Sequence, residues 1–176
     1  RGLGDVYKRQ IQKGLGRFKN MIRKATVADI PQINSLLEQV LMVHYNIRPD
    51  LFKPNTKKYT DSELTDIINA DNTPIFVWTD EQDLARGYAF CQLKSTIGQD
   101  NTQPFKSIYI DDICVDESWR GRHIASSLFE HVKAYAKSIG CHNITLNVWE
   151  GNAAARAFYE RMGMGIQKTT METVLD

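Results

Sequence analysis

Apolar positions in the first part of the chain recur at helical spacing. The segment from Thr26 to Asp29 resembles a capping box, so a helix is expected to begin there and to fade near His44. A second capping box, from Thr60 to Glu63, predicts a shorter helix, and residues 46–55 contain two prolines and are predicted to form a loop. The apolar positions that carry these predictions are Ile30, Ile33, Leu36, Leu37, Val40 and Leu41 for the first helix, and Leu64, Ile67 and Ile68 for the second.

β-favouring segments predict the strands, and the remaining helical patterns lie in the second half of the chain. Strands are predicted at residues 22–25, 75–78, 87–93, 105–115, 144–148 and 166–175. A long helix with one buried face is predicted from Ile124 to Ile139, and Gly140 supplies its C-terminal stop. A last helix is capped by Asn152 and ends at Gly163.

This order of elements predicts a mixed α/β domain. The sheet is expected to be mostly antiparallel, but the strand that ends at Val115 and the strand that starts at Ile144 should run parallel, because a helix crosses between them. Ligands of such sheets collect at the carboxyl ends of the strands. The end of the 105–115 strand is therefore the predicted binding region.

The alternation of the 105–115 strand contains a fault. Ile108 and Ile110 occupy even positions, whereas Ile113 and Val115 occupy odd ones, so a strict period of two cannot place all four on one face. One extra residue near Asp111 would restore the pattern, which is what a β-bulge does. The alternative is a strand that is buried on both faces and needs no bulge.

Two adjacent carboxylates interrupt the same strand. Asp111 and Asp112 stand beside apolar residues, where an unpaired charge is costly unless the site opens to a cleft. A raised pKa on one of them would suit a general base. A salt bridge or a turn is the alternative interpretation.

A short Gly/Arg turn then opens directly into the long helix. Backbone N–H groups at a helix N-terminus are unpaired, and the helix dipole favours negative charge there. The turn is therefore a candidate site for a phosphate-bearing ligand, and Arg120 and Arg122 add positive charge to it.

Composition narrows the class of protein. A chain of 176 residues suits one domain, and a net charge of +1 gives no electrostatic argument for binding nucleic acid or an anionic membrane. No apolar run approaches the roughly 18–20 residues that span a bilayer. Three cysteines, Cys91, Cys114 and Cys141, lack metal-ligand spacing, so we expect no metal site, reduced thiols and a cytoplasmic protein.

The first twenty residues differ from the rest of the chain. They are rich in Gly, Lys and Arg and have no periodic apolar face, and the sequence from Met21 reads like a natural protein start. We interpret residues 1–20 as a disordered or non-native extension, and residues 21–176 as one domain.

Two motifs resemble those of the GNAT family of N-acetyltransferases. The sequence RGRHIA, from Arg120 to Ala125, resembles the family's phosphate-binding motif, and NVWEGNAAARAFYERMGM, from Asn147 to Met164, resembles its second motif. They occur in the family's order and spacing, and the resemblance extends over about Met21 to Leu175. It implies a GNAT-like fold, acetyl-CoA as donor and an amine as acceptor.

The resemblance also implies roles for individual residues. Backbone groups of Ile113 and Val115 would pair with the pantetheine arm, Asn152 would contact the cofactor, and Tyr159 would act as general acid toward the CoA thiolate. The residues implied to hold the pyrophosphate are Arg120, Gly121, Arg122, His123, Ile124, Ala125 and Ser126.

His123 departs from the motif, because the family has glycine at this position. A side chain is unfavourable if the position needs a positive φ, but tolerable if it lies in the first helical turn. We expect the second case.

The acceptor is less well specified by sequence. The segment YIDDICV resembles the corresponding strand of diamine and polyamine acetyltransferases, which makes Asp111 the first candidate for the base and Asp112 the second. Acceptor choice is expected to lie in residues 44–59 and 95–104. The predicted activity is direct transfer to a primary amine of a small molecule or a peptide, without an acyl-enzyme. The alternative is a non-catalytic acyl-CoA-binding sensor. The resemblance also implies that the enzyme or the sensor could form a homodimer.

Overall fold

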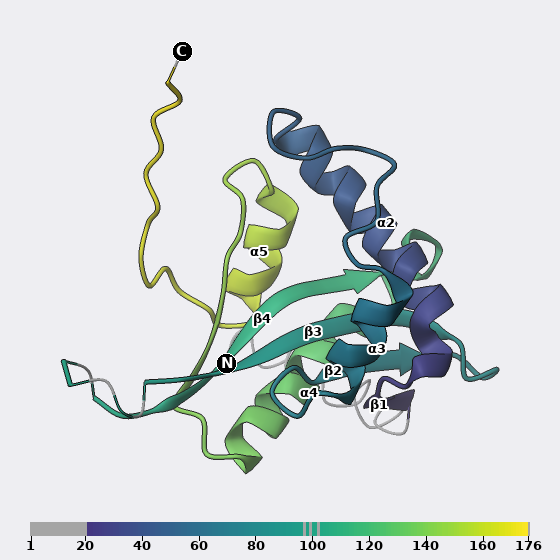
Figure 1. Ribbon diagram of the computed structural model, residues 1–176, viewed down its shortest axis with the longest axis horizontal. Helices are drawn as coiled ribbons and strands as arrows, with labels where there is room; N and C mark the ends of the chain where they lie inside the picture. The colour runs from purple at the N-terminus through teal and green to yellow at the C-terminus, as the bar shows by residue number, and fades with distance from the viewer. Residues whose placement is uncertain (1–20, 97, 99, 102, 176) are drawn as a thin grey trace, which may run out of the picture.

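The computed structural model describes residues 21–175, except 97, 99 and 102 (Figure 1). The predicted extension, residues 1–20, lies outside the described residues. In the described part of the chain, five strands form one sheet in the order β1-β2-β3-β4-β5. The first four pair antiparallel, and β4 and β5 pair parallel, as the mixed α/β prediction required. The strands are β1 (Ile22–Lys24), β2 (Ile75–Thr79), β3 (Ala85–Ser95), β4 (Lys106–Val115) and β5 (Asn143–Leu146).

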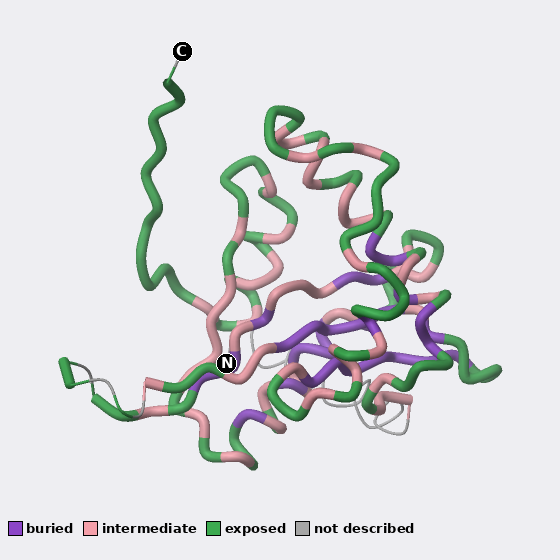
Figure 2. Tube along the Cα trace, in the orientation of Figure 1, coloured by how far each residue is buried: buried purple, intermediate pink, exposed green. Residues whose placement is uncertain are grey.

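Helices cover both faces of the sheet, and each face has its own core (Figure 2). One core packs Ile33, Leu36 and Leu64 from the first two helices against Tyr88 and Phe90 of β3. The other packs the long helix against the opposite face of the same strands. The helices are α2 (Ile30–Ile47), α3 (Asp61–Asn69), α4 (Ile124–Ser138) and α5 (Ala153–Arg161), with short 3₁₀ turns η2 (Val27–Asp29) and η3 (Glu117–Trp119).

The β-bulge that the sequence predicted is present in β4. Phe90 of β3 faces Asp112, and the next residue, Cys91, faces Ile110, so Asp111 has no partner in β3. The extra residue places Ile108, Ile110, Ile113 and Val115 against the α4 core, as predicted. Asp112 and Cys114 therefore point toward the α2 side of the sheet.

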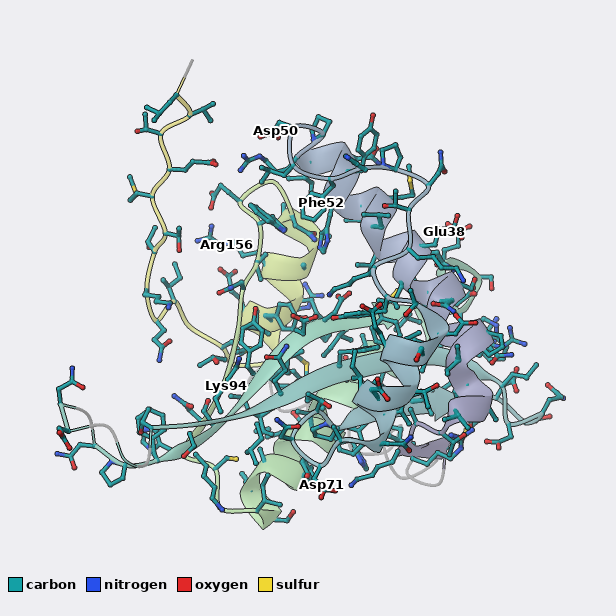
Figure 3. The ribbon with its side chains drawn as sticks, in the orientation of Figure 1. Glu38, Asp50, Phe52, Asp71, Lys94 and Arg156 are labelled. Carbon is teal, nitrogen blue, oxygen red and sulfur yellow. The ribbon has the colours of Figure 1, made fainter. Side chains whose placement is uncertain are left out.

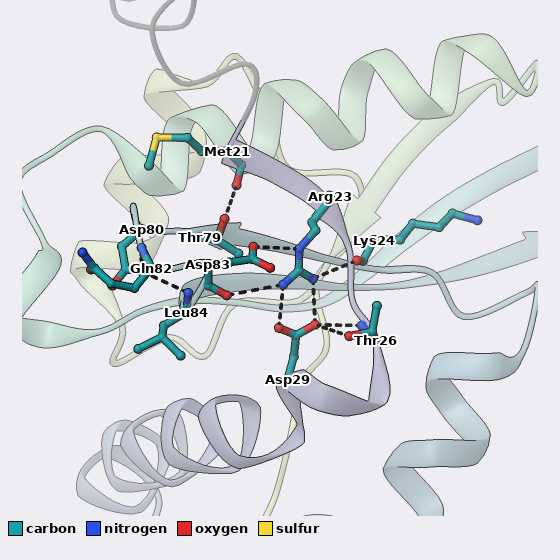
Figure 4. Close-up of polar contacts among 10 residues, drawn as sticks. All are labelled: Met21, Arg23, Lys24, Thr26, Asp29, Thr79, Asp80, Gln82, Asp83 and Leu84. Carbon is teal, nitrogen blue, oxygen red and sulfur yellow. Dashed lines mark hydrogen bonds and ion pairs between the residues drawn. The ribbon is translucent and has the colours of Figure 1, made fainter.

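Both predicted capping boxes are present, and one is part of a larger polar contact. Arg23 of β1 donates to both carboxylate oxygens of Asp29, at 2.8 and 2.9 Å, and to Asp83 in the β2–β3 turn at 3.1 Å (Figure 4). Burial raises the pKa of Asp29, but the Arg23 and Thr26 hydrogen bonds outweigh it and hold that pKa below its usual value. This network joins the first strand to the start of α2.

Several elements differ from the predictions. The helix expected to fade near His44 continues to Ile47, and β5 ends at Leu146 rather than two residues later. The predicted strand over 166–175 is wrong: these residues form no strand, and the tail is an irregular segment (Figure 1). The tail pairs with none of the described strands and contacts the end of α2, where Arg48 pairs with Glu172 at 2.8 Å. None of the described helices is both long and apolar enough to cross a membrane.

Candidate active site

The parallel strands β4 and β5 separate at the predicted carboxyl ends. Their pairing ends at Ile110 and Leu146, whereas β4 continues to Val115. The Asp116 N–H donates to the backbone carbonyl of Arg86 in β3 at 2.9 Å, so the carbonyl of the neighbouring Val115 points away from β3. Alternation turns the backbone groups of Ile113 the same way. From the bulge onward, the β5-facing edge of β4 therefore has no partner strand, and we call this segment the open edge of β4.

The turn that follows β4 leads into the N-terminus of α4. Gly121 has φ +76°, and α4 begins at Ile124, so the N–H groups of its first turn have no partner within the helix. The helix lies close to the sheet here: a Cβ added at Gly87 of β3 would lie 3.0 Å from the Cys114 carbonyl and 3.2 Å from the Ile124 side chain. This close approach holds the anion-favouring end of α4 beside the open edge of β4.

His123 does not lie in the first helical turn, contrary to the sequence expectation. It is the N-cap residue of α4 with φ +61°, in the left-handed region that the motif's usual glycine adopts without strain. The position therefore does require a positive φ, and histidine is one of the residue types that tolerate it better than most.

We predict that His123→Gly stabilises the protein. Left-handed backbone costs an L-residue about 1–2 kcal/mol, and glycine loses roughly 0.5–1 kcal/mol through its more flexible unfolded chain, which leaves a gain of up to about 1.5 kcal/mol. Denaturant unfolding of both proteins measures this difference. A loss of stability would mean that the imidazole makes contacts that outweigh the strain.

The two flanking arginines are anchored at the turn. Arg120 donates from Nε to the Val115 carbonyl at 3.1 Å. The Arg122 guanidinium lies 4.5 Å from the ring centroid of Trp119, a cation–π contact. Both cations are thus placed between the end of β4 and the start of α4.

The two carboxylates at the bulge have different surroundings. Asp111 Oδ2 lies 2.7 Å from Lys58 Nζ, so for Asp111 the salt-bridge interpretation holds. Asp112 accepts a hydrogen bond from the hydroxyl of the fully buried Tyr88 at 3.1 Å. Burial raises the pKa of Asp112 to about 6, against the lowering effects of the Lys58 charge and the Tyr88 hydrogen bond. Asp112 is therefore the carboxylate with the properties of a base near neutral pH.

Lys58 belongs to the loop expected to select the acceptor, but the sequence analysis did not single it out. Its neighbour Tyr59 stacks on Phe90 at 6.2 Å, which fixes this end of the loop over the sheet. Burial and the Lys58 charge lower the pKa of His44, so His44 faces the same region. No local pattern marks Lys58, because its partner Asp111 is 53 residues away.

The rings of His44, Phe52 and Trp149 pack together near Lys58. Phe52 packs edge-on against Trp149 at 5.7 Å and beside His44 at 5.1 Å. Arg48 lies over the Trp149 ring at 5.5 Å. Figure 3 shows Phe52 between the end of α2 and α5. In the other segment expected to select the acceptor, residues 95–104, the described residues lie beyond the ends of β3 and β4 instead (Figure 1).

The second motif places Tyr159 on α5 next to the α4 core. Its ring packs against Phe129 at 6.2 Å and Phe158 at 5.0 Å. Burial and the charge of Asp112 raise the pKa of Tyr159, so its hydroxyl keeps its proton at neutral pH. Asn152 caps α5 by accepting from the Ala155 N–H at 3.1 Å, as predicted.

The cysteines are unsuited to nucleophilic chemistry. Burial raises the pKa of Cys91 and of Cys114 to about 12, so each remains a thiol at neutral pH. Within the described part of the chain, no three His, Cys, Asp or Glu side chains gather as metal ligands would.

Comparison with known proteins gives a family match and several structural likenesses. The model of the acetyltransferase (GNAT) family matches residues 42–164. Glucosamine 6-phosphate N-acetyltransferase of Arabidopsis thaliana is 30% identical over 71 residues, which cover 40% of this chain and 46% of that protein. The chain thus spans about half the length of this curated relative.

Solved structures match over almost their whole length. A mutant of the BH1408 protein from Bacillus halodurans is 34% identical, with a TM-score of 0.83, and the match covers 88% of this chain and 98% of that one. The aminoglycoside N-acetyltransferase AAC(6')-Iy, in complex with CoA, has a TM-score of 0.64 at 15% identity and the same two coverages. The second likeness shows the fold alone.

Proposed function

This chain belongs to the acetyltransferase (GNAT) family, and from this premise we propose that it transfers an acetyl group from acetyl-CoA directly to a primary amine. The observation that carries the proposal is the open edge of β4, which leads from the N-terminus of α4 to the carboxylates at the bulge. An extended ligand with an anionic tail fits such a path, because one end offers strand pairing and the other offers unpaired N–H groups.

Three contacts would hold the cofactor along this path. The N–H groups of residues 120–126 would bind the pyrophosphate, with the cations of Arg120 and Arg122 beside it. Backbone groups of Ile113 and Val115 would pair with the pantetheine arm, for which Arg120 must release the Val115 carbonyl. Asn152, at the start of α5, would contact the arm from the other side. The thioester would then lie level with the bulge.

The residues at the bulge would supply the proton transfers. As the amine nitrogen bonds to the thioester carbonyl carbon, Asp112 would take the nitrogen's proton. When the carbon–sulfur bond breaks, Tyr159 would give its proton to the CoA sulfur. We place Asp112 ahead of Asp111 as the base because Asp111 is paired with Lys58. The high thiol pKa values of Cys91 and Cys114 support direct transfer over an acyl-enzyme.

The proposed acceptor is a primary amine on a small molecule or a peptide. The relatives are named for an amino-sugar phosphate and for aminoglycosides, which carry primary amines. The carboxylates Asp111 and Asp112 favour a cationic acceptor. Polyamines are cationic amines, and the YIDDICV segment is similar to the corresponding strand of polyamine acetyltransferases.

A panel of polyamines, lysine analogues, amino sugars and aminoglycosides, assayed for free thiol, tests the acceptor class. Activity with at least one amine is expected, with initial rates that require a ternary complex rather than ping-pong kinetics. Cofactor binding with no turnover on any amine would favour the non-catalytic sensor. Light scattering separately tests the homodimer.

Acetyl-CoA is expected to raise the melting temperature. A ligand at 100 times its Kd stabilises the native state by about 2.7 kcal/mol. Each kcal/mol corresponds to roughly 2–4 °C in a domain of this size, so the shift should be about 5–10 °C. Acetyl-pantetheine, which lacks the diphosphate, is the matched control and should give a smaller shift at equal concentration. No shift with saturating acetyl-CoA would contradict the proposed cofactor site.

A further inference from the structure

An amine of the protein itself occupies the place proposed for the acceptor. Lys58 Nζ lies 2.7 Å from Asp111, at the bulge, and 5.3 Å from the ring centroid of Tyr59. The charge of Lys58 also lowers the pKa of Asp112, so the ammonium is near both carboxylates. Hydrogen bonding to Asp111 raises the pKa of Lys58 against the lowering effect of its burial.

The preceding lysine has quite different surroundings. The Lys57 side chain is 68% exposed, and its nearest acidic partner is the equally exposed Asp61 at 3.5 Å. The Lys58 side chain is 43% exposed and points inward. The chain therefore offers two adjacent lysines, of which only Lys58 faces the bulge.

The bulge is also where the thioester would lie. Asp111 is the first residue of β4 beyond the pairing with β5, and Val115 is the last, next to the α4 turn. Four residues of strand span about 13 Å. An extended arm whose anionic end lies at α4 would thus bring its far end to the level of Asp111, beside Lys58 Nζ.

We propose that Lys58 is an internal acetyl acceptor: with acetyl-CoA bound and no amine present, the enzyme acetylates its own Lys58. This inference rests on the proposed function. The ε-ammonium loses one proton to Asp112, and Nζ then bonds to the carbonyl carbon. The carbon–sulfur bond breaks, and CoA leaves as a thiol with the proton from Tyr159. The second proton that Nζ loses restores the Tyr159 hydroxyl, and Asp112 releases the first proton to solvent. Each event consumes one acetyl-CoA and yields one acetyl-lysine, one CoA and one proton.

Self-acetylation would change the acceptor site. It removes the positive charge of Lys58 and with it the ion pair to Asp111. The carboxylate of Asp111 would then be available to a cationic acceptor. Unmodified Lys58 competes with such an acceptor, and acetylated Lys58 does not.

Peptide mass spectrometry of the whole protein after incubation with acetyl-CoA tests the proposal. Lys58 is expected to gain one acetyl group at least about tenfold faster than Lys57, because only Lys58 is held near the thioester. The rate should be first order and independent of protein concentration, and an added acceptor amine should slow it. Lys58→Arg, which keeps the charge beside Asp111, should lose this modification, whereas Lys57→Arg should keep it.

Several results would overturn the proposal. Equal rates at Lys57 and Lys58 would indicate chemical acetylation without catalysis. A rate that rises with protein concentration would indicate transfer between molecules. Acetylation of an added amine with Lys58 unmodified would refute self-acetylation and leave the proposed function intact. If neither Lys58 nor any amine is acetylated, the proposed function fails as well.

Discussion

Replacement of Tyr159 by phenylalanine is expected to lower kcat by roughly 10- to 10⁴-fold. The change removes the hydroxyl that would protonate the departing CoA sulfur. It keeps the ring that packs against Phe129 and Phe158, so the fold and the cofactor path should persist. Thiol release at saturating substrates measures kcat, and the thermal shift with acetyl-CoA should equal that of the unchanged protein.

A second tyrosine provides the matched control. Tyr135 of α4 packs against Phe76 at 5.1 Å, at the edge of the α4 core rather than at the bulge. Tyr135→Phe removes a phenolic hydroxyl of the same kind from a different position and is expected to leave kcat unchanged. An equal kcat for Tyr159→Phe and the unchanged enzyme would take Tyr159 out of the proton transfer.

Asp112→Asn is expected to lower kcat/KM by about 10²–10⁴-fold, because the amide cannot accept the proton of the amine. In the unchanged enzyme kcat/KM should rise through an inflection near pH 6, where Asp112 ionises. The variant should lack that inflection. Asp111→Asn, which breaks the Lys58 ion pair instead, is the neighbouring control and should retain it.

Asp112→Asn should also stabilise the folded protein. The pKa of Asp112 is raised from 3.8 to about 6, so between these values the folded state holds a proton that the unfolded state has lost. Ionisation of Asp112 therefore destabilises the folded state, fully above pH 6 and not at all below pH 3.8. Asparagine avoids this penalty and can still accept from Tyr88.

Melting curves as a function of pH measure this effect. The variant should melt above the unchanged protein at pH 7–8, and the difference should shrink as the pH falls through 6. A gain in stability together with a loss of activity is typical of a group retained for function. A variant that is less stable at pH 7–8 would contradict the raised pKa.

Features that depend on neighbours in the chain could be predicted from the sequence. The capping boxes join residues three positions apart, so Thr60 and Glu63 identify a helix start without further context. The bulge at Asp111 follows from the parity of four apolar residues within one strand. Three segments of the candidate site could be identified in the same way, because the strand, the turn after it and the second motif each have a local sequence pattern.

The positive φ of His123 and the absence of a strand in the tail could not be predicted from local patterns. His123 adopts a positive φ because the turn must join the end of β4 to a helix held against Gly87, and that constraint comes from packing. The tail has a strand-like composition, but pairing depends on contacts between distant parts of the chain, and its Glu172 contacts Arg48 instead.

The sequence by itself determined the order of the elements before the tail, the bulge and the two motifs that resemble those of the family, because each arises from residues close together along the chain. Only the tertiary structure decided which carboxylate is paired. Lys58 reaches Asp111 across 53 residues, and Tyr88 reaches Asp112 across 24. The charge state of a group depends on what surrounds it in space, so adjacent and chemically identical aspartates acquire different properties only once the chain has folded.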